Sequence, residues 1–383
     1  MAMLELLFWG CVAFVFYGYL GYPLIMFVLA RLFPRPVARG DITPPVSLII
    51  TARNEQARIG DKITNSLALD YPRDRFEIIV TSDCSTDDTH AIVERYADQG
   101  VRLVVAPERR GKEFAQKCAI RASTGEILVF SDVATRLDPT GVRAIVANFA
   151  DPGVGCVSSV DRLVDADGTV SGEGAYVRYE MFLRSLESQV GSVVGLSGSF
   201  FAARRACCDP WLEDLPSDFC TLLNTMQHGM RGVSDDQAIG YYPNLANKSN
   251  EYGRKVRTVV RGMSGLGRHL HLLNPFRYGL ASWQLFSHKV CRWLVPFGML
   301  GALIANLALL FLPRTPLWPL YVVTAVVQLG AYAVAANGAR DPEKQSGIPR
   351  LLTFLVLVNV SILNAWVNVL RGRRVVAWEP SRR

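Results

Sequence analysis

Residues 46–55 read Val-Ser-Leu-Ile-Ile-Thr-Ala-Arg-Asn-Glu, a mostly apolar run that ends in polar and charged side chains. Two further apolar runs end in the same way, in Ser-Asp-Cys-Ser-Thr-Asp-Asp-Thr (Ser82–Thr89) and in Phe-Ser-Asp-Val-Ala-Thr (Phe130–Thr135). A fourth signature, Pro-Ser-Asp-Phe, lies at Pro216–Phe219. Open α/β sheets bind their ligands at the carboxyl ends of their strands. The first three signatures therefore predict a nucleotide pocket by their position.

Strand-like and helix-like segments alternate from Val46 onward, which is typical of a mostly parallel, Rossmann-like sheet covered by helices. We expect strands at Val46–Thr51, Phe76–Thr81, Val101–Val105, Glu126–Phe130 and Gly155–Val160. We expect helices at Ile59–Ala68, Asp87–Ala97, Lys112–Ala122 and Pro139–Phe149. Segment 165–174 is rich in glycine and is predicted to be a loop.

Four long apolar runs predict membrane-spanning segments. Half of the 383 residues are hydrophobic (50%), which is more than a soluble enzyme needs. The runs lie at Met3–Ala30, Val290–Leu312, Leu317–Ala336 and Leu351–Leu370, and each has about the ~20 residues that a spanning helix requires. The first run has no charged leader and no small-residue cleavage site, so we expect an anchor and not a removable signal peptide.

Cysteine usage and charge point to the cytosolic side of a membrane. None of the eight cysteines forms a Cys-x-x-Cys pair, which favours reduced thiols over disulfides or a zinc site. The formal charge is +7, and arginines gather after the first and last apolar runs. They are Arg31, Arg35, Arg39, Arg371, Arg373, Arg374, Arg382 and Arg383. This placement suits an anionic membrane face and not a nucleic acid.

The ordered signatures resemble those of the family 2 inverting glycosyltransferases of the GT-A fold, in the membrane-bound branch related to polysaccharide synthases. The resemblance covers residues 46–261, and Trp378-Glu379-Pro380 is similar to the tail of such enzymes. It implies a cytosolic GT-A domain with flanking transmembrane helices. The donor it implies is a UDP-sugar.

The resemblance also implies which residues contact the nucleotide. Asp83 would accept a hydrogen bond from the uracil base, with Asn54 and Glu55 as partners for base and ribose. Arg109, Gly111 and Lys112 are similar to the Gly-Lys turn that lies over the nucleotide in this family. An alternative for Ser82–Asp88 is an N-capped helix start without a ligand.

Asp132 matches the first carboxylate of the family's metal motif and would also contact the nucleotide through a bound Mg²⁺ or Mn²⁺ ion. The chain departs from the Asp-x-Asp pattern, because the second acid is replaced by Ala134. One carboxylate, substrate phosphates and water can still complete a Mg²⁺ shell. The alternative is an enzyme that depends weakly on metal and relies on Arg and Lys.

Asp218 stands at the position of the family's catalytic base, preceded by Ser217. Asp214, Asp235 and Asp236 are nearby alternatives, and an N-cap role for Asp218 before a helix at Phe219–Met230 is compatible with catalysis. In the small-residue segment Gly195–Phe201, Gly198 and Ser199 would leave room for the acceptor.

Arg254 and Arg257 are implied diphosphate contacts, at the place where processive synthases carry Gln-x-x-Arg-Trp. Juxtamembrane charge is the alternative explanation for residues 254–261. Thr258 replaces the tryptophan that holds the acceptor sugar in processive members, which favours the addition of one or a few sugars.

We expect five parts: an anchor (1–33), a GT-A domain (41–268), an interfacial amphipathic segment (270–289), transmembrane helices (290–371) and a basic tail (372–383). The expected location is the inner (cytoplasmic) membrane with the catalytic domain in the cytosol. Three full spans after the domain would place the arginine-rich tail outside, against the usual charge distribution. We therefore expect one incomplete crossing.

The predicted function is inverting transfer of a hexosyl group from a UDP-sugar to a lipid-linked or growing glycan acceptor. One alternative is a processive exopolysaccharide synthase that couples synthesis to translocation. The other is a catalytically silent membrane protein that binds a nucleotide or glycan, suggested by Ala134 and Ser217.

Overall fold

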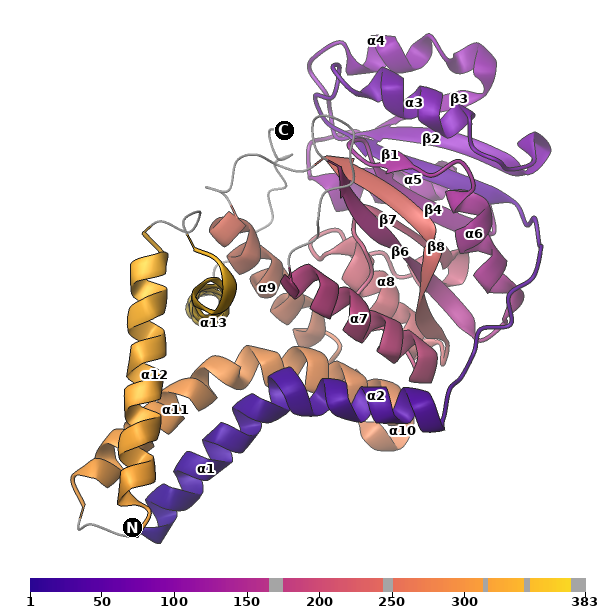
Figure 1. The fold of residues 1–383 in the computed structure, drawn as a ribbon. Coiled ribbons are helices and arrows are strands. Elements are labelled where there is room, and N and C mark those ends of the chain that lie inside the picture. The colour runs from indigo at the N-terminus through magenta and orange to yellow at the C-terminus, as the bar shows by residue number, and fades with distance from the viewer. Residues whose placement is uncertain (165–174, 244–250, 313–315, 341–344, 373–383) are drawn as a thin grey trace. The chain divides into compact units, whose positions relative to one another are not determined.

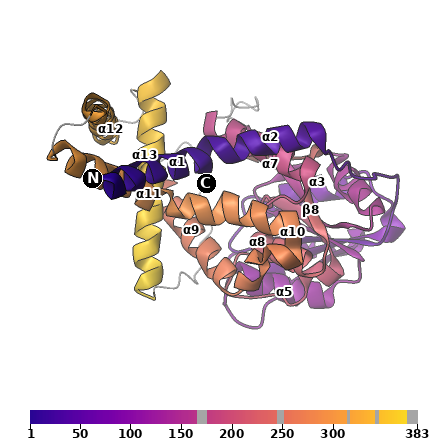
Figure 2. The same ribbon diagram turned by 90° about the horizontal axis from the view of Figure 1, so that it is seen from below.

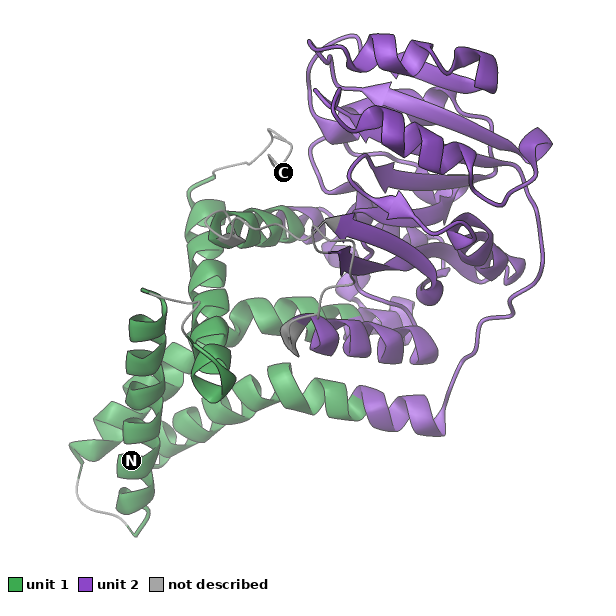
Figure 3. Ribbon diagram, turned by 45° about the horizontal axis from the view of Figure 1, so that its top comes forward, with its two compact units in different colours: residues 1–25, 248–263, 285–375 green, residues 26–247, 264–284, 376–383 purple. Residues whose placement is uncertain are grey.

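The computed structural model describes residues 1–164, 175–243, 251–312, 316–340 and 345–372 (Figure 1). The predicted loop at 165–174, the Trp378-Glu379-Pro380 motif and Arg373, Arg374, Arg382 and Arg383 lie outside the described residues. The chain forms two compact units. Unit 1 comprises Met1–Ile25, Lys248–Met263 and Leu285–Val375, and unit 2 comprises Met26–Asn247, Ser264–Gln284 and Val376–Arg383 (Figure 3).

Unit 2 is built on an eight-stranded mixed sheet with the order β3-β2-β1-β4-β7-β6-β8-β5. One half is parallel and consists of β3 (Val101–Val105), β2 (Phe76–Ser82), β1 (Val46–Ala52) and β4 (Ile127–Asp132). β7 (Phe200–Arg204) runs antiparallel between β4 and β6 (Val154–Val164). β6 pairs in parallel with β8 (Arg231–Pro243), and β5 (Arg136–Leu137) closes the edge.

Helices on both faces bury the central strands. Every residue of β1 is buried, as expected for a strand covered from both sides. One core joins Leu48 and Ile50 of β1 to apolar residues of α3 (Ile59–Leu67), α4 (Thr89–Glu94) and α6 (Gly141–Ala147). α5 (Lys112–Ala122) contacts β1 and β2, whereas α7 (Ala175–Val190) and α8 (Ser217–Gln227) contact β8.

The predicted α/β fold with a largely parallel sheet is confirmed, and the differences are local. All five predicted strands exist, and α5 has the predicted bounds. α4 begins at Thr89 and not at Asp87, because Asp87 accepts hydrogen bonds from the backbone N–H and the hydroxyl of Thr89 ahead of the helix. α6 begins at Gly141 and not at Pro139, because Asp138 forms a turn with Thr140 in the same way. β5, β7 and β8 are strands that we did not predict.

Unit 1 consists of helices. α1 (Ala2–Phe16) packs along α11 (Arg292–Leu310), α11 contacts α12 (Trp318–Gly338), and α12 contacts α13 (Gly347–Leu370) (Figure 2). The contact between α1 and α11 is close at two glycines of α11. A Cβ atom at Gly301 would lie 2.9 Å from the Cys11 sulfur, and one at Gly298 would lie 3.1 Å from Phe14. Small residues of this kind let membrane helices approach each other.

Four helices in the described part of the chain are long and apolar enough to cross a membrane: Ala2–Leu32, Pro275–Leu310, Trp318–Gly338 and Gly347–Leu370. The first continues from α1 through a π-helical turn into α2 (Tyr22–Leu32). The predicted interfacial segment 270–289 is not separate from the next span. It forms α10 (Pro275–Leu285), with a kink at Gly279, and runs on into α11.

Candidate active site

Asp83 lies where β2 ends, and its side chain is fully buried. Its Oδ1 atom accepts hydrogen bonds from the backbone N–H groups of Arg110 (3.1 Å) and Gly111 (3.0 Å). Gly111 has φ = 101°, a conformation that favours glycine. The second oxygen, Oδ2, is buried without a hydrogen-bond partner among the described residues. An unpaired buried acceptor is costly, so this oxygen is available for a donor group on a ligand.

Asn54 and Glu55 connect the end of β1 by hydrogen bonds to the loop that contains Asp83. The Asn54 side-chain oxygen accepts from the backbone N–H of Thr86 (2.8 Å), and the backbone N–H of Glu55 donates to the Thr89 hydroxyl (2.9 Å). The Glu55 carboxylate pairs with Arg58, with 2.9 Å between Oε2 and Nε. The structure therefore places both residues beside Asp83, and their contacts with base and ribose stay predictions.

Arg110, which we did not predict, stabilises the loop next to Asp83. Besides its backbone bond to Asp83, its guanidinium pairs with Glu213 (2.7 Å) and lies over the Phe114 ring at 4.6 Å. The neighbouring Arg109, which we predicted, is exposed on the same turn. Residue type alone cannot distinguish two adjacent arginines, because only the turn geometry decides which backbone N–H faces Asp83.

Lys112 and Asp132 form an ion pair between the start of α5 and the end of β4. The Lys112 Nζ atom lies 2.6 Å from Asp132 Oδ1 and 3.3 Å from the Gly198 carbonyl oxygen. Burial alone would lower the pKa of Lys112, but Asp132, Glu113 and Asp218 outweigh burial and raise it. This lysine is therefore a fixed positive charge next to a carboxylate.

Asp218 lies in the first turn of α8 and faces Gly198. A Cβ atom at Gly198 would lie only 3.1 Å from Asp218 Oδ2, so any larger residue there would push the Asp218 carboxylate aside by a few tenths of an ångström. Pro216 is the residue that caps α8, and Asp218 Oδ1 accepts from the backbone N–H of Phe219 (2.9 Å). The structure thus brings Lys112, Asp132, Gly198 and Asp218 together.

Two of the three alternative acids, Asp214 and Asp235, are engaged elsewhere. Asp214 pairs with Arg268, at 2.9 Å between Oδ1 and Nη1. Asp235 pairs with Arg39 (3.2 Å) and accepts from the Asn148 amide (2.6 Å). Asp218 is therefore the stronger candidate base among these acids.

Asp132 is the acid that would hold a divalent ion. Its side chain is 29% exposed, and the ion pair with Lys112 uses Oδ1. No group of three or more His, Cys, Asp or Glu side chains in the described part of the chain could hold a metal on its own. Mg²⁺ is commonly bound by one or two carboxylates together with substrate phosphates. The site therefore fits an ion that arrives with a diphosphate.

Lys62 of α3 is a buried lysine beneath the Asp132 turn, and sequence gave no signal for it. Its Nζ atom donates to the Ser131 hydroxyl (2.7 Å) and to the Thr135 carbonyl oxygen (2.5 Å). Burial lowers its pKa from 10.5 to about 7, although Asp132 opposes the shift. A neutral amine has the two donors that these two contacts require.

Folding stability should therefore rise with pH above pH 7. Because the folded-state pKa of Lys62 is about 7 and the unfolded value is 10.5, the unfolded chain binds more protons between these values. Stability is lost as pH falls from 10.5 towards 7. We expect Lys62→Met to reduce the increase of folding stability with pH. We expect Lys117→Met, which removes a more exposed ammonium, to leave this increase unchanged. Thermal unfolding of the wild-type protein and the two variants from pH 7 to pH 10 would measure this dependence. An equal change of stability with pH in all three would contradict the lowered pKa of Lys62.

Arg254 and Arg257 lie on α9 (Glu251–Gly267), in the part of that helix that belongs to unit 1. Thr258 is exposed on the same helix. In unit 1, Lys255 lies over the Phe354 ring, 4.3 Å from its centre. The predicted diphosphate contacts of the two arginines stay predictions.

Comparison with known proteins connects this geometry to a family. Residues 47–208 match the model of "Glycosyl transferase family 2". Residues 47–208 therefore form a glycosyl transferase family 2 domain. The matched segment includes Asp83, Lys112, Asp132 and Gly198, and Asp218 follows it in the chain.

Two curated glycosyltransferases are similar to this chain. A beta-monoglucosyldiacylglycerol synthase of Synechocystis sp. is 30% identical over 184 residues, which are 45% of this chain and 38% of the relative. An N-acetylglucosaminyltransferase of Rhizobium sp. is 24% identical over 322 residues, 79% of this chain and 70% of the relative. The chain thus spans less than half the length of the first relative.

One solved structure is similar over nearly the whole chain. It is a mannosyltransferase from Pyrobaculum calidifontis, in complex with GDP-Man and Mn²⁺, with a TM-score of 0.71 and 22% identity. The similarity covers 96% of this chain and 99% of that one. The predicted GT-A fold is confirmed.

Proposed function

We propose that this protein transfers a sugar, with inversion, from a UDP-sugar to a lipid-linked or growing glycan acceptor at the cytosolic face of the inner membrane. The proposal rests on one observation. The side chains of Lys112, Asp132 and Asp218 lie close together around Gly198, next to Asp83. A carboxylate base, a cationic group and a nucleotide subsite are what a single displacement at an anomeric carbon needs.

In this reaction Asp218 takes the proton of the acceptor hydroxyl. The hydroxyl oxygen forms a bond to the anomeric carbon as the bond from that carbon to the diphosphate oxygen breaks. One displacement inverts the configuration. The ammonium group of Lys112 stabilises the negative charge that develops on the leaving diphosphate.

Asp132 would hold Mg²⁺ or Mn²⁺ together with the diphosphate. A bound divalent ion would supply further positive charge to the leaving group. The similar mannosyltransferase was solved with Mn²⁺, which supports the assignment of such an ion here.

The unpaired oxygen of Asp83 restricts the base of the donor. A carboxylate accepts hydrogen bonds, so it suits the N3–H of uracil or the N1–H of guanine, whereas the donors of unprotonated adenine and cytosine at their pairing edge are exocyclic amino groups. We assign a uridine nucleotide. Guanosine is the second candidate, because the mannosyltransferase of similar fold was solved with GDP-Man.

The acceptor and the membrane location are supported by two observations. Four described helices could cross a membrane, and the Synechocystis relative is named for a diacylglycerol lipid product. Thr258 offers no aromatic face on which a growing sugar chain could stack. We therefore favour a lipid-linked acceptor and a short product over processive synthesis of a polysaccharide.

The nucleotide assignment is tested by binding. Asp83→Asn keeps an oxygen for Arg110 and Gly111 but replaces the free acceptor with an N–H donor. We expect UDP affinity to fall by roughly 10- to 150-fold, the range for losing a hydrogen bond of ~1.5–3 kcal/mol to a charged group. Calorimetry with UDP, GDP, ADP and CDP would measure it, with exposed Asp98→Asn as the control. Tight binding of ADP or CDP by the wild-type protein would refute the base assignment.

A further inference from the structure

Residues Ser197, Gly198 and Ser199 precede β7 at a point where its pairing with β6 has not yet begun. β7 pairs with β6 only from Ala203 to Phe201, which lies opposite Ser158. Beyond Ser158, β6 continues its pairing with β8, where Asp161 lies opposite Gly240. On the side that faces β6, the chain that leads into β7 is therefore held by side chains.

Asp161 of β6 holds this segment from one side. Its Oδ2 atom accepts from the Ser197 hydroxyl (2.6 Å), and its Oδ1 atom accepts from the Ser199 hydroxyl (2.5 Å). The two hydroxyls are 2.8 Å apart. Burial raises the pKa of Asp161, although these hydroxyls and Arg184 oppose the shift.

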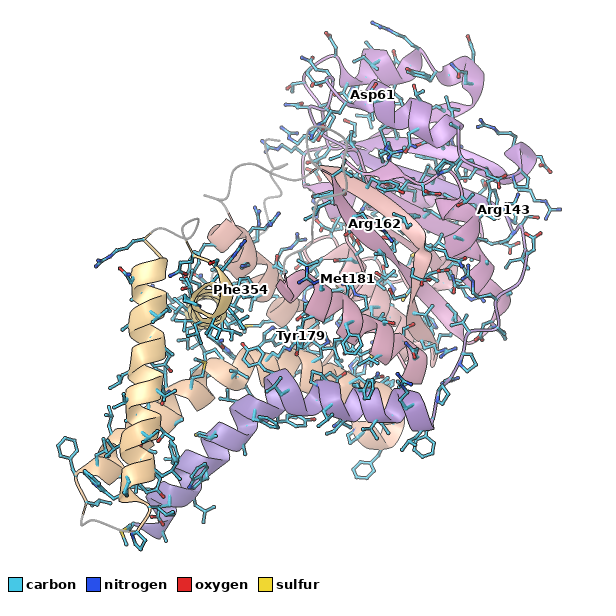
Figure 4. All side chains as sticks on the ribbon, viewed as in Figure 1. Asp61, Arg143, Arg162, Tyr179, Met181 and Phe354 are labelled. Atoms are coloured by element: carbon cyan, nitrogen blue, oxygen red, sulfur yellow. The ribbon has the colours of Figure 1, made fainter. Side chains whose placement is uncertain are left out.

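The side chain of Asp161 is half-buried. Its neighbour Arg162, labelled in Figure 4, is exposed, and successive side chains of a strand point to opposite faces of the sheet. The segment is held further by the Ser158 hydroxyl, which accepts from the backbone N–H of Ser197 (2.8 Å).

The same three residues touch the groups assigned to transfer. The Ser199 carbonyl oxygen accepts from the backbone N–H of Asp132 (2.9 Å). The Gly198 carbonyl oxygen accepts from Lys112, and the Cα atom of Gly198 faces Asp218. A shift of this segment would therefore move the surface in front of the candidate base.

We infer that Asp161 is a positioning residue, which holds Ser197, Gly198 and Ser199 so that the space in front of Asp218 stays open for the acceptor hydroxyl. The inference rests on the proposed function and adds a residue to it. It predicts that Asp161 acts mainly on the acceptor step and has a smaller effect on donor binding.

The test separates transfer to the acceptor from hydrolysis of the donor by water. Water is small and needs little positioning, whereas the acceptor hydroxyl must be aligned with the anomeric carbon. We expect Asp161→Ala to lower the ratio of transfer to hydrolysis by about 10- to 100-fold, because a misplacement of ~1 Å can cost 10²-fold in rate. The KM for the donor should change by a smaller factor than this ratio.

Two further variants keep the test decisive if Asp161→Ala folds poorly. Asp161→Asn keeps one oxygen for a serine and should show a smaller fall in the ratio. The double variant Ser197→Ala/Ser199→Ala should match Asp161→Ala, and adding Asp161→Ala to it should have little further effect. Asp138→Asn is the matched control, since Asp138 also accepts from a hydroxyl, that of Thr140 (2.9 Å), and contacts no residue of the site.

An unchanged ratio of transfer to hydrolysis in the Asp161 variants, with transfer intact in the wild-type protein, would overturn the inference alone. A parallel fall of both rates with lower thermal stability would also overturn it, because Asp161 would then have only a structural role. If the wild-type protein transfers no sugar with any donor, the proposed function fails and the inference falls with it.

Discussion

Asp218→Asn is expected to lower the turnover for sugar transfer by about 10²- to 10⁴-fold, the contribution typical of a general base. Asparagine has nearly the same shape but cannot take the proton of the acceptor hydroxyl. The fold and UDP binding should be unchanged, because Asp218 contacts Gly198 and the N–H of Phe219 and not the nucleotide loop around Asp83. Initial rates of UDP release with saturating acceptor would measure the change.

Asp214→Asn is the matched control for this variant. Asp214 lies four residues earlier in the chain, and its carboxylate pairs with Arg268. We expect near-normal turnover for Asp214→Asn. Near-normal turnover of Asp218→Asn would remove Asp218 from the mechanism, and a loss confined to Asp214→Asn would move the base to Asp214.

Asp132→Ala is expected to weaken UDP binding in the presence of Mg²⁺ or Mn²⁺ by more than about tenfold, which corresponds to ~1.4 kcal/mol. The variant removes the acid that would hold the ion and leaves Lys112 without its partner at 2.6 Å. Ala134→Asp should tighten metal binding, because it restores the second acid of the motif. Calorimetric titrations of UDP with and without metal would measure both effects.

A chelator distinguishes the metal from the charge of Lys112. If the wild-type protein binds UDP equally well with and without chelator, the ion has no part in nucleotide binding. The diphosphate would then depend on lysine and arginine side chains, as in the alternative considered from the sequence.

The parallel half of the sheet could be predicted because its strands are buried on both faces. β1, β2 and β4 read as nearly continuous apolar runs that end in Asn54, Asp83 and Asp132. These runs set the strand positions, and the ends of parallel strands meet at one edge of a sheet. Lys112 could be expected near Asp132 for the same reason, since α5 begins at the edge of the sheet where β4 ends.

The antiparallel half could not be predicted in this way. Phe200–Arg204 reads as a short apolar segment after small residues, and nothing local shows that it inserts between β4 and β6. The role of Asp161 depends on that long-range pairing, and the role of Lys62 depends on its burial beneath the Asp132 turn. Both residue types are usually solvated, so their sequence positions carried no sign of a buried contact.

The most direct test of the account is the product that the wild-type protein makes. The full chain, purified in detergent, would be incubated with radiolabelled UDP-sugars and a membrane lipid extract, and label would be counted in organic and aqueous phases. The account predicts UDP release that depends on the lipid extract, and a labelled lipid one sugar heavier by mass spectrometry. A high-molecular-weight polymer would support the processive synthase instead. Binding of UDP-sugars with no UDP release under any condition would contradict the proposed glycosyl transfer.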